Sequence, residues 1–336
     1  ETFMKILIDC CLISAEMRGM GVYLWNILPA ISRIPNSSFL LVTNNHSGYS
    51  KLKNMFGGYP NVEVKIAKAP QPLYEQILLP IIAFSNKPDL YISSGNTSSL
   101  LRISDKQVSL IHDVYYLKDK ENSSEANSFK RMIGRFYRKL TISISAKRSI
   151  QVITVSEFAR GDIIEELGID RRLVSVVPNG IDVPVRREFL TKESRLLFVS
   201  GSDRQKNLHG ILPKLLSNSD VRAKFTSIDV VGVNNAAELG IADDDLMVFH
   251  GYCEYDFVQN LYRYCSHFMI PSLYESFGIP AIEALVSGCR VVSTNRGALP
   301  EVLSGNAIYF DPLSVDSVEK MVKELLHSES LTNEEC

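Results

Sequence analysis

The sequence predicts an α/β fold made of two Rossmann-like, doubly wound domains, and three observations indicate it. Short apolar runs alternate with amphipathic segments, as in parallel sheets covered by helices. The 336 residues are enough for about two domains, each burying its own core. The alternation is interrupted once, by VPNGIDVPVRR, whose prolines, Asn-Gly pair and basic pair are typical of an interdomain linker.

We therefore expect an N-terminal domain at 1–180 and a C-terminal domain at 181–336. The expected strands lie at 5–9, 39–43, 62–66, 89–92, 108–111, 151–155, 174–177, 195–199, 227–231, 246–249, 267–270, 290–293 and 307–310. The expected helices lie at 21–33, 71–84, 128–148, 156–167, 207–216, 254–265, 279–287, 299–303 and 315–326. The helix at 156–167 has the clearest ends, because Ser156 can cap its N-terminus and Gly168 can end it.

Composition argues against several classes of protein. The formal net charge of −2 gives no overall attraction to nucleic acid, so that partner is not expected. The longest apolar run, ILLPIIAF, is too short to span a membrane. The six cysteines form no C-x2-C pair and have no neighbouring His at ligand spacing. We therefore expect no metal site and a reducing, cytoplasmic environment.

Two segments of the first domain carry possible binding residues. In SAEMRGMGVYLWNIL, Gly19 and Gly21 open a helix, where free N–H groups favour an anion. Leu24 stands where a dinucleotide fingerprint needs a third glycine, so a nicotinamide cofactor is not expected. In SLIHDVYYL, His112 and Asp113 follow a predicted strand, at the edge where open α/β sheets bind ligands. They are either a polar strand cap or a pair that contacts a hydroxyl or phosphate.

A basic loop begins the second domain's series of helices. In VSGSDRQKNLHGIL, Arg204 and Lys206 lie at a strand-to-helix junction. Two cations there can neutralise a departing diphosphate without a metal. Solvated lysines are also common near helix starts, although they oppose the helix dipole.

The stretch PSLYESFGIPAIEALVSG combines a helix start with two carboxylates. Pro280 suits the first turn of a helix, and Gly278 lets backbone N–H groups approach a phosphate. Glu275 and Glu283 would flank that anion site and accept hydrogen bonds from sugar hydroxyls. The alternative is that both are ordinary surface glutamates.

These segments resemble, in the same order along the chain, the retaining glycosyltransferases of family 4, and among them the bacterial mannosyltransferase-like group 1 transferases. The resemblance extends from RGMGVYLWNILPAI through HDVYYLKDKE, VITVSEFARGDIIEELGI and SGSDRQKNL to PSLYESFGIPAIEALVSG. Its most specific element is the Glu-x7-Glu pattern after Pro-Ser. The family has the GT-B fold, so the resemblance implies two Rossmann-like domains that face each other across a cleft.

The resemblance also implies a role for each matching residue. Glu275 would contact hydroxyls of the donor hexose, Glu283 would contact the ribose, and His112 would lie near the transferred sugar. Lys206 would bind the diphosphate, and Arg204 is the candidate for the second cation there. The remaining donor contacts would come from Gly19, Gly21, Ser202, Phe277, Gly278 and Ile279.

Two features depart from the family pattern. Gln205 stands immediately before Lys206, where Arg is usual, and Arg204 is one position earlier. The chain also ends soon after the helix expected at 315–326, so we expect the crossover helices that follow in relatives to be missing.

The function implied is hexose transfer, with retention and without a metal or cofactor, from a nucleotide diphosphate sugar to a hydroxyl of a glycan or lipid-linked acceptor in surface polysaccharide synthesis. The N-terminal motifs resemble those of bacterial mannosyl- and rhamnosyl-type transferases, and GDP-mannose is the first choice of donor. The alternatives are a GT-B sugar-nucleotide epimerase, which needs no acceptor, and a catalytically silent sugar-nucleotide-binding protein.

The segment 129–148, FKRMIGRFYRKLTISISAKR, is basic and amphipathic. It can form a helix that packs on its sheet with a solvated face, or one that lies on an anionic membrane. The second alternative would make the chain a peripheral protein on the inner face of the plasma membrane.

Overall fold

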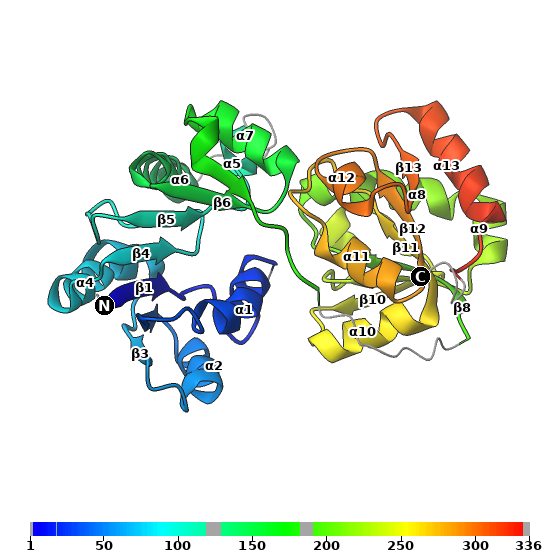
Figure 1. Ribbon diagram of the computed structural model, residues 1–336. Helices are drawn as coiled ribbons and strands as arrows, with labels where there is room; N and C mark the ends of the chain where they lie inside the picture. The colour runs from blue at the N-terminus through cyan, green and yellow to red at the C-terminus, as the bar shows by residue number, and fades with distance from the viewer. Residues whose placement is uncertain (1–2, 18, 119–128, 182–190, 332–336) are drawn as a thin grey trace. The chain divides into compact units, whose positions relative to one another are not determined.

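The computed structural model describes residues 3–17, 19–118, 129–181 and 191–331 (Figure 1). The chain divides into two compact units, Glu1–Gly180 and Ile181–Cys336. Each unit has one parallel sheet with helices between successive strands, which confirms the predicted α/β class. Part of the predicted linker, 182–187, lies outside the described residues.

The first unit is built on a seven-stranded parallel sheet in the order β3-β2-β1-β4-β5-β6-β7. Its strands are β1 (Met4–Asp9), β2 (Ser37–Thr43), β3 (Val62–Ile66), β4 (Leu90–Ser93), β5 (Gln107–Leu110), β6 (Gln151–Thr154) and β7 (Val174–Val176). The chain builds the sheet outward from β1 in one direction and then from β4 in the other. The carboxyl ends of β1 and β4 therefore form the switch point where such sheets bind ligands.

The helices of the first unit agree with the prediction except in four places. They are α1 (Gly19–Ile31), α2 (His46–Phe56), α3 (Gln71–Leu73), the π-helix η1 (Tyr74–Leu78), α4 (Leu79–Asn86), α5 (Tyr115–Lys118), α6 (Phe129–Arg148), α7 (Glu157–Leu167) and the 3-10 helix η2 (Arg171–Leu173). The prediction lacked α2, α5 and η2. It also treated 71–84 as one regular helix, whereas this segment has a π-helical middle, followed by Pro80, which has no N–H to donate.

The second unit is built on a six-stranded parallel sheet in the order β10-β9-β8-β11-β12-β13. Its strands are β8 (Glu193–Val199), β9 (Ser227–Val231), β10 (Met247–Gly251), β11 (Cys265–Ile270), β12 (Arg290–Thr294) and β13 (Ile308–Phe310). Here the order reverses between β8 and β11. The loops that follow these two strands therefore lie at the switch point of the second sheet.

Helices cover both faces of the second sheet, as a doubly wound fold requires (Figure 1). The elements between and after the strands are the 3-10 helices η3 (Arg204–Lys206) and η4 (Ala236–Leu239), and the helices α8 (Leu208–Leu216), α9 (Ser219–Lys224), α10 (Tyr255–Tyr264), α11 (Ile279–Val286), α12 (Leu299–Leu303) and α13 (Val315–His327). Apolar side chains of α8, α9 and α13 pack with Leu196 and Phe198 on one face, and those of α10, α11 and α12 pack with Leu197 on the other. The prediction lacked α9.

The predicted ends of the 156–167 helix are confirmed. The Ser156 Oγ accepts a hydrogen bond from the Ala159 N–H at 3.0 Å, and Gly168 ends the helix with a φ of 61°. None of the described helices is long and apolar enough to cross a membrane.

We expect the substitution Ser314→Ala to lower the free energy of unfolding by about 1 kcal/mol, because the Ser314 side chain caps α13 by accepting a hydrogen bond from the Ser317 N–H. Ser314→Gly is the matched control and should cost only a few tenths of a kcal/mol. Urea unfolding of the two variants measures both effects. Equal losses in the two variants would show that the cap does not stabilise α13.

Candidate active site

The central feature of the second unit's site is an ion pair between Lys206 and Glu275. Lys206 is the last residue of η3, which follows β8, and Glu275 lies in the loop between β11 and α11. The Lys206 Nζ is 2.7 Å from the Glu275 Oε2, and the two side chains are 25% and 17% exposed. Glu275 is therefore not an ordinary surface glutamate, and a cation is held at the carboxyl edge of the sheet.

Backbone hydrogen bonds fix the loops that carry this pair. The Leu273 N–H donates to the Gln205 carbonyl at 2.7 Å, which joins the loop after β11 to η3. The Ala298 N–H donates to the Glu275 carbonyl at 2.8 Å, and Gly297 makes that approach possible. A Cβ atom on Gly297 would lie 2.4 Å from the Glu275 carbonyl oxygen, and its φ of 65° also favours glycine.

Helix α11 begins beside Glu275, at Gly278. Gly278 has a φ of 96°, and a Cβ atom there would lie 2.6 Å from the Leu299 side chain and 3.6 Å from the Glu275 Cγ. Pro280 is in the first turn, as predicted, and Phe277 is buried. In the first turn of α11 the Ala281 N–H donates to the Gly278 carbonyl at 3.0 Å and Pro280 has no N–H, so the Ile279 N–H and the positive end of the helix dipole are what the helix start can offer to an anion.

The other predicted residues of the second unit occupy different positions around this edge. Glu283 lies one turn inside α11, where it is half-buried and its Oε1 accepts a hydrogen bond from the Tyr255 hydroxyl at 3.1 Å. Ser202 and Arg204 are exposed on the loop after β8. The structure therefore brings Lys206, Glu275 and the start of α11 together, and it leaves Arg204 exposed at the beginning of η3.

In the first unit, His112 lies just after β5 and is buried. Its backbone N–H donates to the Asn96 Oδ1 at 3.0 Å, and its ring packs edge to face with Tyr23 of α1 at 4.8 Å between centroids. Within the described residues the His112 Nε2 has no hydrogen-bond partner. Burial lowers the pKa of His112 to about 4, so the ring is neutral at neutral pH. A neutral ring with one unpaired nitrogen can exchange a hydrogen bond with a ligand hydroxyl.

The glycines of the N-terminal loop serve different structural purposes. Helix α1 begins at Gly19, which is exposed, and a Cβ atom there would meet no described atom within 4 Å. Gly21 lies inside the helix, where a Cβ atom would be 2.6 Å from the Leu12 carbonyl oxygen. The packing of α1 on the preceding loop therefore requires Gly21, and the donor contacts expected of both glycines stay predictions.

Sequence reasoning missed several residues that hold the site in place: Gly297, Tyr255, Asn96 and Tyr23. Gly297 had a signal, because Asn-Arg-Gly between a strand and a Pro-containing helix is typical of a turn with positive φ. The other three contact partners far away in the sequence, and nothing near them indicates it. Within the described ranges, no group of three or more His, Cys, Asp or Glu side chains could hold a metal ion.

We expect Gly297→Ala to reduce turnover on the order of 100-fold, because the new methyl group would displace the Glu275 backbone. Gly305→Ala is a matched control, since Gly305 also has a positive φ but no atom of the described residues lies within 4 Å of its Cβ position. Steady-state kinetics and thermal unfolding of both variants distinguish a loss of the Glu275 contact from a general effect of backbone strain. Equal losses of turnover in the two would contradict the importance of this contact.

The stability of the chain should depend on the protonation of His112. The unfolded His takes up a proton as pH falls below about 6.5, whereas the folded one resists until its pKa of about 4, so its contribution to stability is complete above pH 6.5 and is lost toward pH 4. Between pH 7 and 4, the wild type should lose on the order of 3 kcal/mol more than His112→Gln. Urea unfolding at both pH values measures this. Parallel losses would mean that the ring is not held neutral.

Comparisons with known proteins show which family the two units resemble. Residues 19–184 match the protein family described as Glycosyltransferase Family 4, and residues 185–335 match Glycosyl transferases group 1. The O-antigen chain mannosyltransferase RfbU of Salmonella typhimurium is 26% identical over 91% of this chain and 87% of its own length. The MMP alpha-(1->4)-mannosyltransferase of Mycolicibacterium hassiacum is 28% identical over 69% of this chain and 60% of its own length.

Solved structures show the same fold. HepE of Anabaena, in complex with UDP and glucose, has a TM-score of 0.66 at 16% identity and covers 97% of this chain and 90% of its own. WaaG, a glycosyltransferase involved in lipopolysaccharide biosynthesis, has a TM-score of 0.65 at 14% identity, over 96% and 90%. The two Rossmann-like units are therefore those of the GT-B fold, and the chain belongs to the glycosyltransferases that combine a family 4 domain with a group 1 domain.

Proposed function

We propose that this glycosyltransferase moves mannose from GDP-mannose to a hydroxyl of a glycan or lipid-linked acceptor in surface polysaccharide synthesis, with retention and without a metal. The observation that carries the proposal is the Lys206–Glu275 ion pair beside the start of α11. The ion pair and the helix start bring together a cation, a carboxylate and a helix N-terminus. A cation and a helix N-terminus can bind a diphosphate, and a carboxylate can accept hydrogen bonds from sugar hydroxyls. The names of the relatives, which include mannosyltransferases of O-antigen chains, support the choice of sugar.

In the proposed reaction, the bond between the anomeric carbon and the diphosphate oxygen breaks, and the acceptor oxygen bonds to the anomeric carbon on the same face. The acceptor proton passes to the departing diphosphate oxygen, so no carboxylate of the enzyme acts as a base or as a nucleophile. The barrier depends mainly on the negative charge that develops on the leaving diphosphate. Lys206 and the positive end of α11 would stabilise that charge.

Glu275 and Glu283 would hold the donor rather than transfer protons. Glu275 now accepts from Lys206, and with donor bound its other oxygen can accept from a sugar hydroxyl. Glu283 already accepts from the Tyr255 hydroxyl and would accept from the ribose as well. The unpaired Nε2 of the neutral His112 would take a hydroxyl of the transferred sugar.

We also propose a cytoplasmic location, as the cysteine pattern suggests. The described cysteines, Cys10, Cys11, Cys253, Cys265 and Cys289, are all free thiols. Free thiols are the usual state in a reducing compartment.

Lys206→Ala should lower turnover on the order of 100-fold or more, because it removes an electrostatic stabiliser of the leaving group. Lys214→Ala, an exposed lysine of α8, is the matched control and should keep normal turnover. Mannose transfer to a hydroxyl acceptor measures both. Near-normal turnover of Lys206→Ala would remove this lysine from the mechanism.

The donor can be identified by thermal unfolding with UDP, GDP, dTDP and ADP sugars. A donor at 100 times its Kd stabilises the folded state by about 2.7 kcal/mol, and we expect this shift with GDP-mannose.

Transfer should survive EDTA, so strict dependence on added Mg²⁺ or Mn²⁺ would contradict the proposed reaction. Conversion of the donor sugar without any acceptor would instead indicate an epimerase.

A further inference from the structure

The first unit contains a buried carboxylate that the proposed reaction does not use. Glu75 lies in the π-helix η1 and is only 1% exposed. A carboxylate in a protein core lowers stability unless hydrogen bonds or a cation replace the lost water. Within the described residues, the hydrogen-bond partners of Glu75 are all neutral side chains. Apolar residues of similar volume are often as stable in such a position, so its presence points to a task other than stability.

Three segments of the unit meet at the two carboxylate oxygens of Glu75. The Oε1 atom accepts from the Thr97 hydroxyl in the loop after β4 and from the Gln71 Nε2 of α3, each at 2.7 Å. The Oε2 atom accepts from the Tyr137 hydroxyl of α6. Gln71 also donates to the Thr97 hydroxyl oxygen at 3.2 Å, so Gln71, Thr97 and Glu75 form a closed ring of hydrogen bonds. Such a network specifies one arrangement of the loop after β4.

The neighbours of this glutamate in η1 hold further segments. The Tyr74 hydroxyl lies 2.8 Å from the Asp9 Oδ1 at the end of β1. The Gln76 Oε1 accepts from the Leu100 N–H at 2.8 Å, and the Gln76 Nε2 donates to the Ser98 carbonyl at 3.2 Å. Three consecutive side chains of η1 therefore contact the end of β1 and several residues of the loop after β4. Single π-helical turns such as this one are frequent at functional sites.

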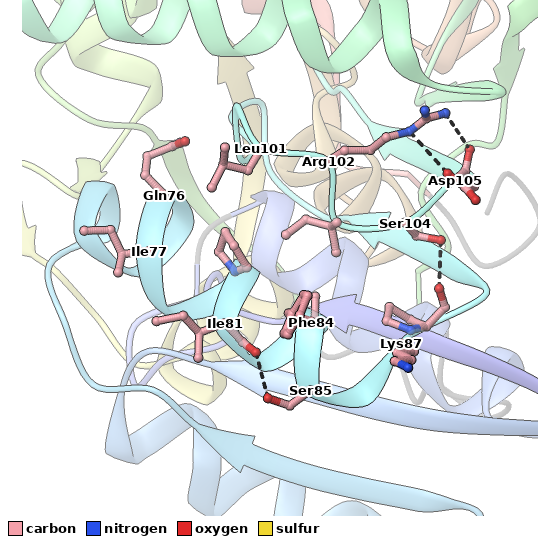
Figure 2. A pocket seen from close by; sticks show the side chains of 14 residues that line it. Gln76, Ile77, Ile81, Phe84, Ser85, Lys87, Leu101, Arg102, Ser104 and Asp105 are labelled. Carbon is pink, nitrogen blue, oxygen red and sulfur yellow. Dashed lines mark hydrogen bonds and ion pairs between the residues drawn. The ribbon is translucent and has the colours of Figure 1, made fainter.

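Gln76 holds the outer part of this loop. Gln76 and Leu101 line a hollow of about 780 Å³ between α4 and the loop 100–105 (Figure 2). Leu101 is 58% exposed and packs little against the unit. Because the loop borders open space on this side, hydrogen bonds and not packing join it to η1 there. The attachment of the loop therefore depends on polar groups of η1, those of Glu75 and Gln76.

The loop after β4 leads from Glu75 to His112. Asn96 precedes Thr97, and the Asn96 Oδ1 accepts from the His112 backbone N–H at 3.0 Å. The Ser93 hydroxyl donates to the Thr97 carbonyl at 3.3 Å, which fixes the backbone between these contacts. Two adjacent residues of the loop are thus held by Glu75 on one side and bind His112 on the other. The backbone of His112 has a support that leads back to η1.

We propose that Glu75 is a positioning residue for sugar transfer. Through Thr97 and Asn96 it fixes the backbone of His112, and it thereby sets where the unpaired Nε2 of that ring would meet a hydroxyl of the transferred sugar. This role rests on the proposed function, because the part of His112 in transfer is what connects the loop to turnover. It also explains a carboxylate in the core, since only such a group accepts from three donors at once.

Hydrogen exchange of the His112 amide tests the link in the free protein. The chain has six histidines, so ¹⁵N labelling of histidine alone gives few amide signals, and the signal missing from His112→Gln is that of His112. Thr97→Val removes the hydroxyl but keeps the shape of the side chain. We expect the His112 amide of this variant to exchange about fivefold faster, the factor that corresponds to one lost hydrogen bond. Thr97→Ser keeps the hydroxyl and should exchange as the wild type does.

Tyr137→Phe is the matched control. It removes one hydrogen bond from the same carboxylate, but on the side of α6 and not on the side of the loop. It should therefore lower thermal stability about as much as Thr97→Val does and leave the exchange of the His112 amide unchanged. If Thr97→Val does not fold, Thr97→Ala removes the same hydroxyl without demanding space. Equal acceleration of exchange in Tyr137→Phe and Thr97→Val would show that Glu75 only stabilises the core.

Turnover tests the connection with transfer. Thr97→Val should lower kcat on the order of tenfold, because the ring of His112 would be less well placed, and Thr97→Ser should restore it. In a His112→Ala background the same substitution should change kcat little, since the residue through which it acts is already removed. Mannose transfer by the single and double variants gives this comparison.

Two further outcomes would overturn the proposal. One is a His112 amide that exchanges in Thr97→Val as it does in the wild type. The other is an equal fold loss of kcat when Thr97→Val is added to the wild type and to His112→Ala, since the two residues would then act independently. If the exchange results are as expected but the wild type transfers no mannose, the proposed function fails and the link from Glu75 to His112 stands.

Discussion

The site in the second unit depends on the contact between the Glu275 backbone and the turn at Gly297. The Ala298 N–H holds the Glu275 carbonyl, and the bare Cα of Gly297 leaves room for it. Because this contact fixes Glu275, it also fixes the Lys206 ammonium that pairs with it and the direction in which α11 begins. Loops after three neighbouring strands, β8, β11 and β12, thus act as one rigid support for a small set of charges.

Most elements could be predicted because their sequence patterns are unambiguous. The bounds of β3, β9 and α12 agree to the residue: β3 alternates apolar and charged residues, β9 is a short β-branched run, and α12 has a proline in its first turn. Helix α2 was missed because glycine, serine and lysine weaken its pattern. Its signal was the Asn45 cap with buried Gly48, Leu52 and Phe56 at helical spacing. The π-helix η1 has no pattern that periodicity alone could reveal.

The site was predictable to a different extent. Motif residues such as Lys206, Glu275 and Gly278 can be recognised in the sequence, because charges beside a helix start marked by glycine and proline are unusual in a core. The residues that support the site cannot be recognised in this way. Tyr255 contacts a residue 28 positions away, and Asn96 contacts one 16 positions away. Such contacts depend on strand order, which periodicity does not encode. The amphipathic pattern of 129–148 predicted α6, one face of which packs on the sheet through Ile142 and Ala146.

The glycine that begins α11 has a consequence for how this enzyme can diversify. At Gly278 both the positive φ and the nearby Leu299 side chain disfavour any larger residue, so a smaller residue at 299 would relieve only half of the obstacle. Substitution of Gly278 is therefore not a route to new sugars, either in natural evolution or in laboratory selection. Side chains around this turn can still change. Variants with altered donors should therefore keep the same backbone at Gly278 and differ in the side chains around it.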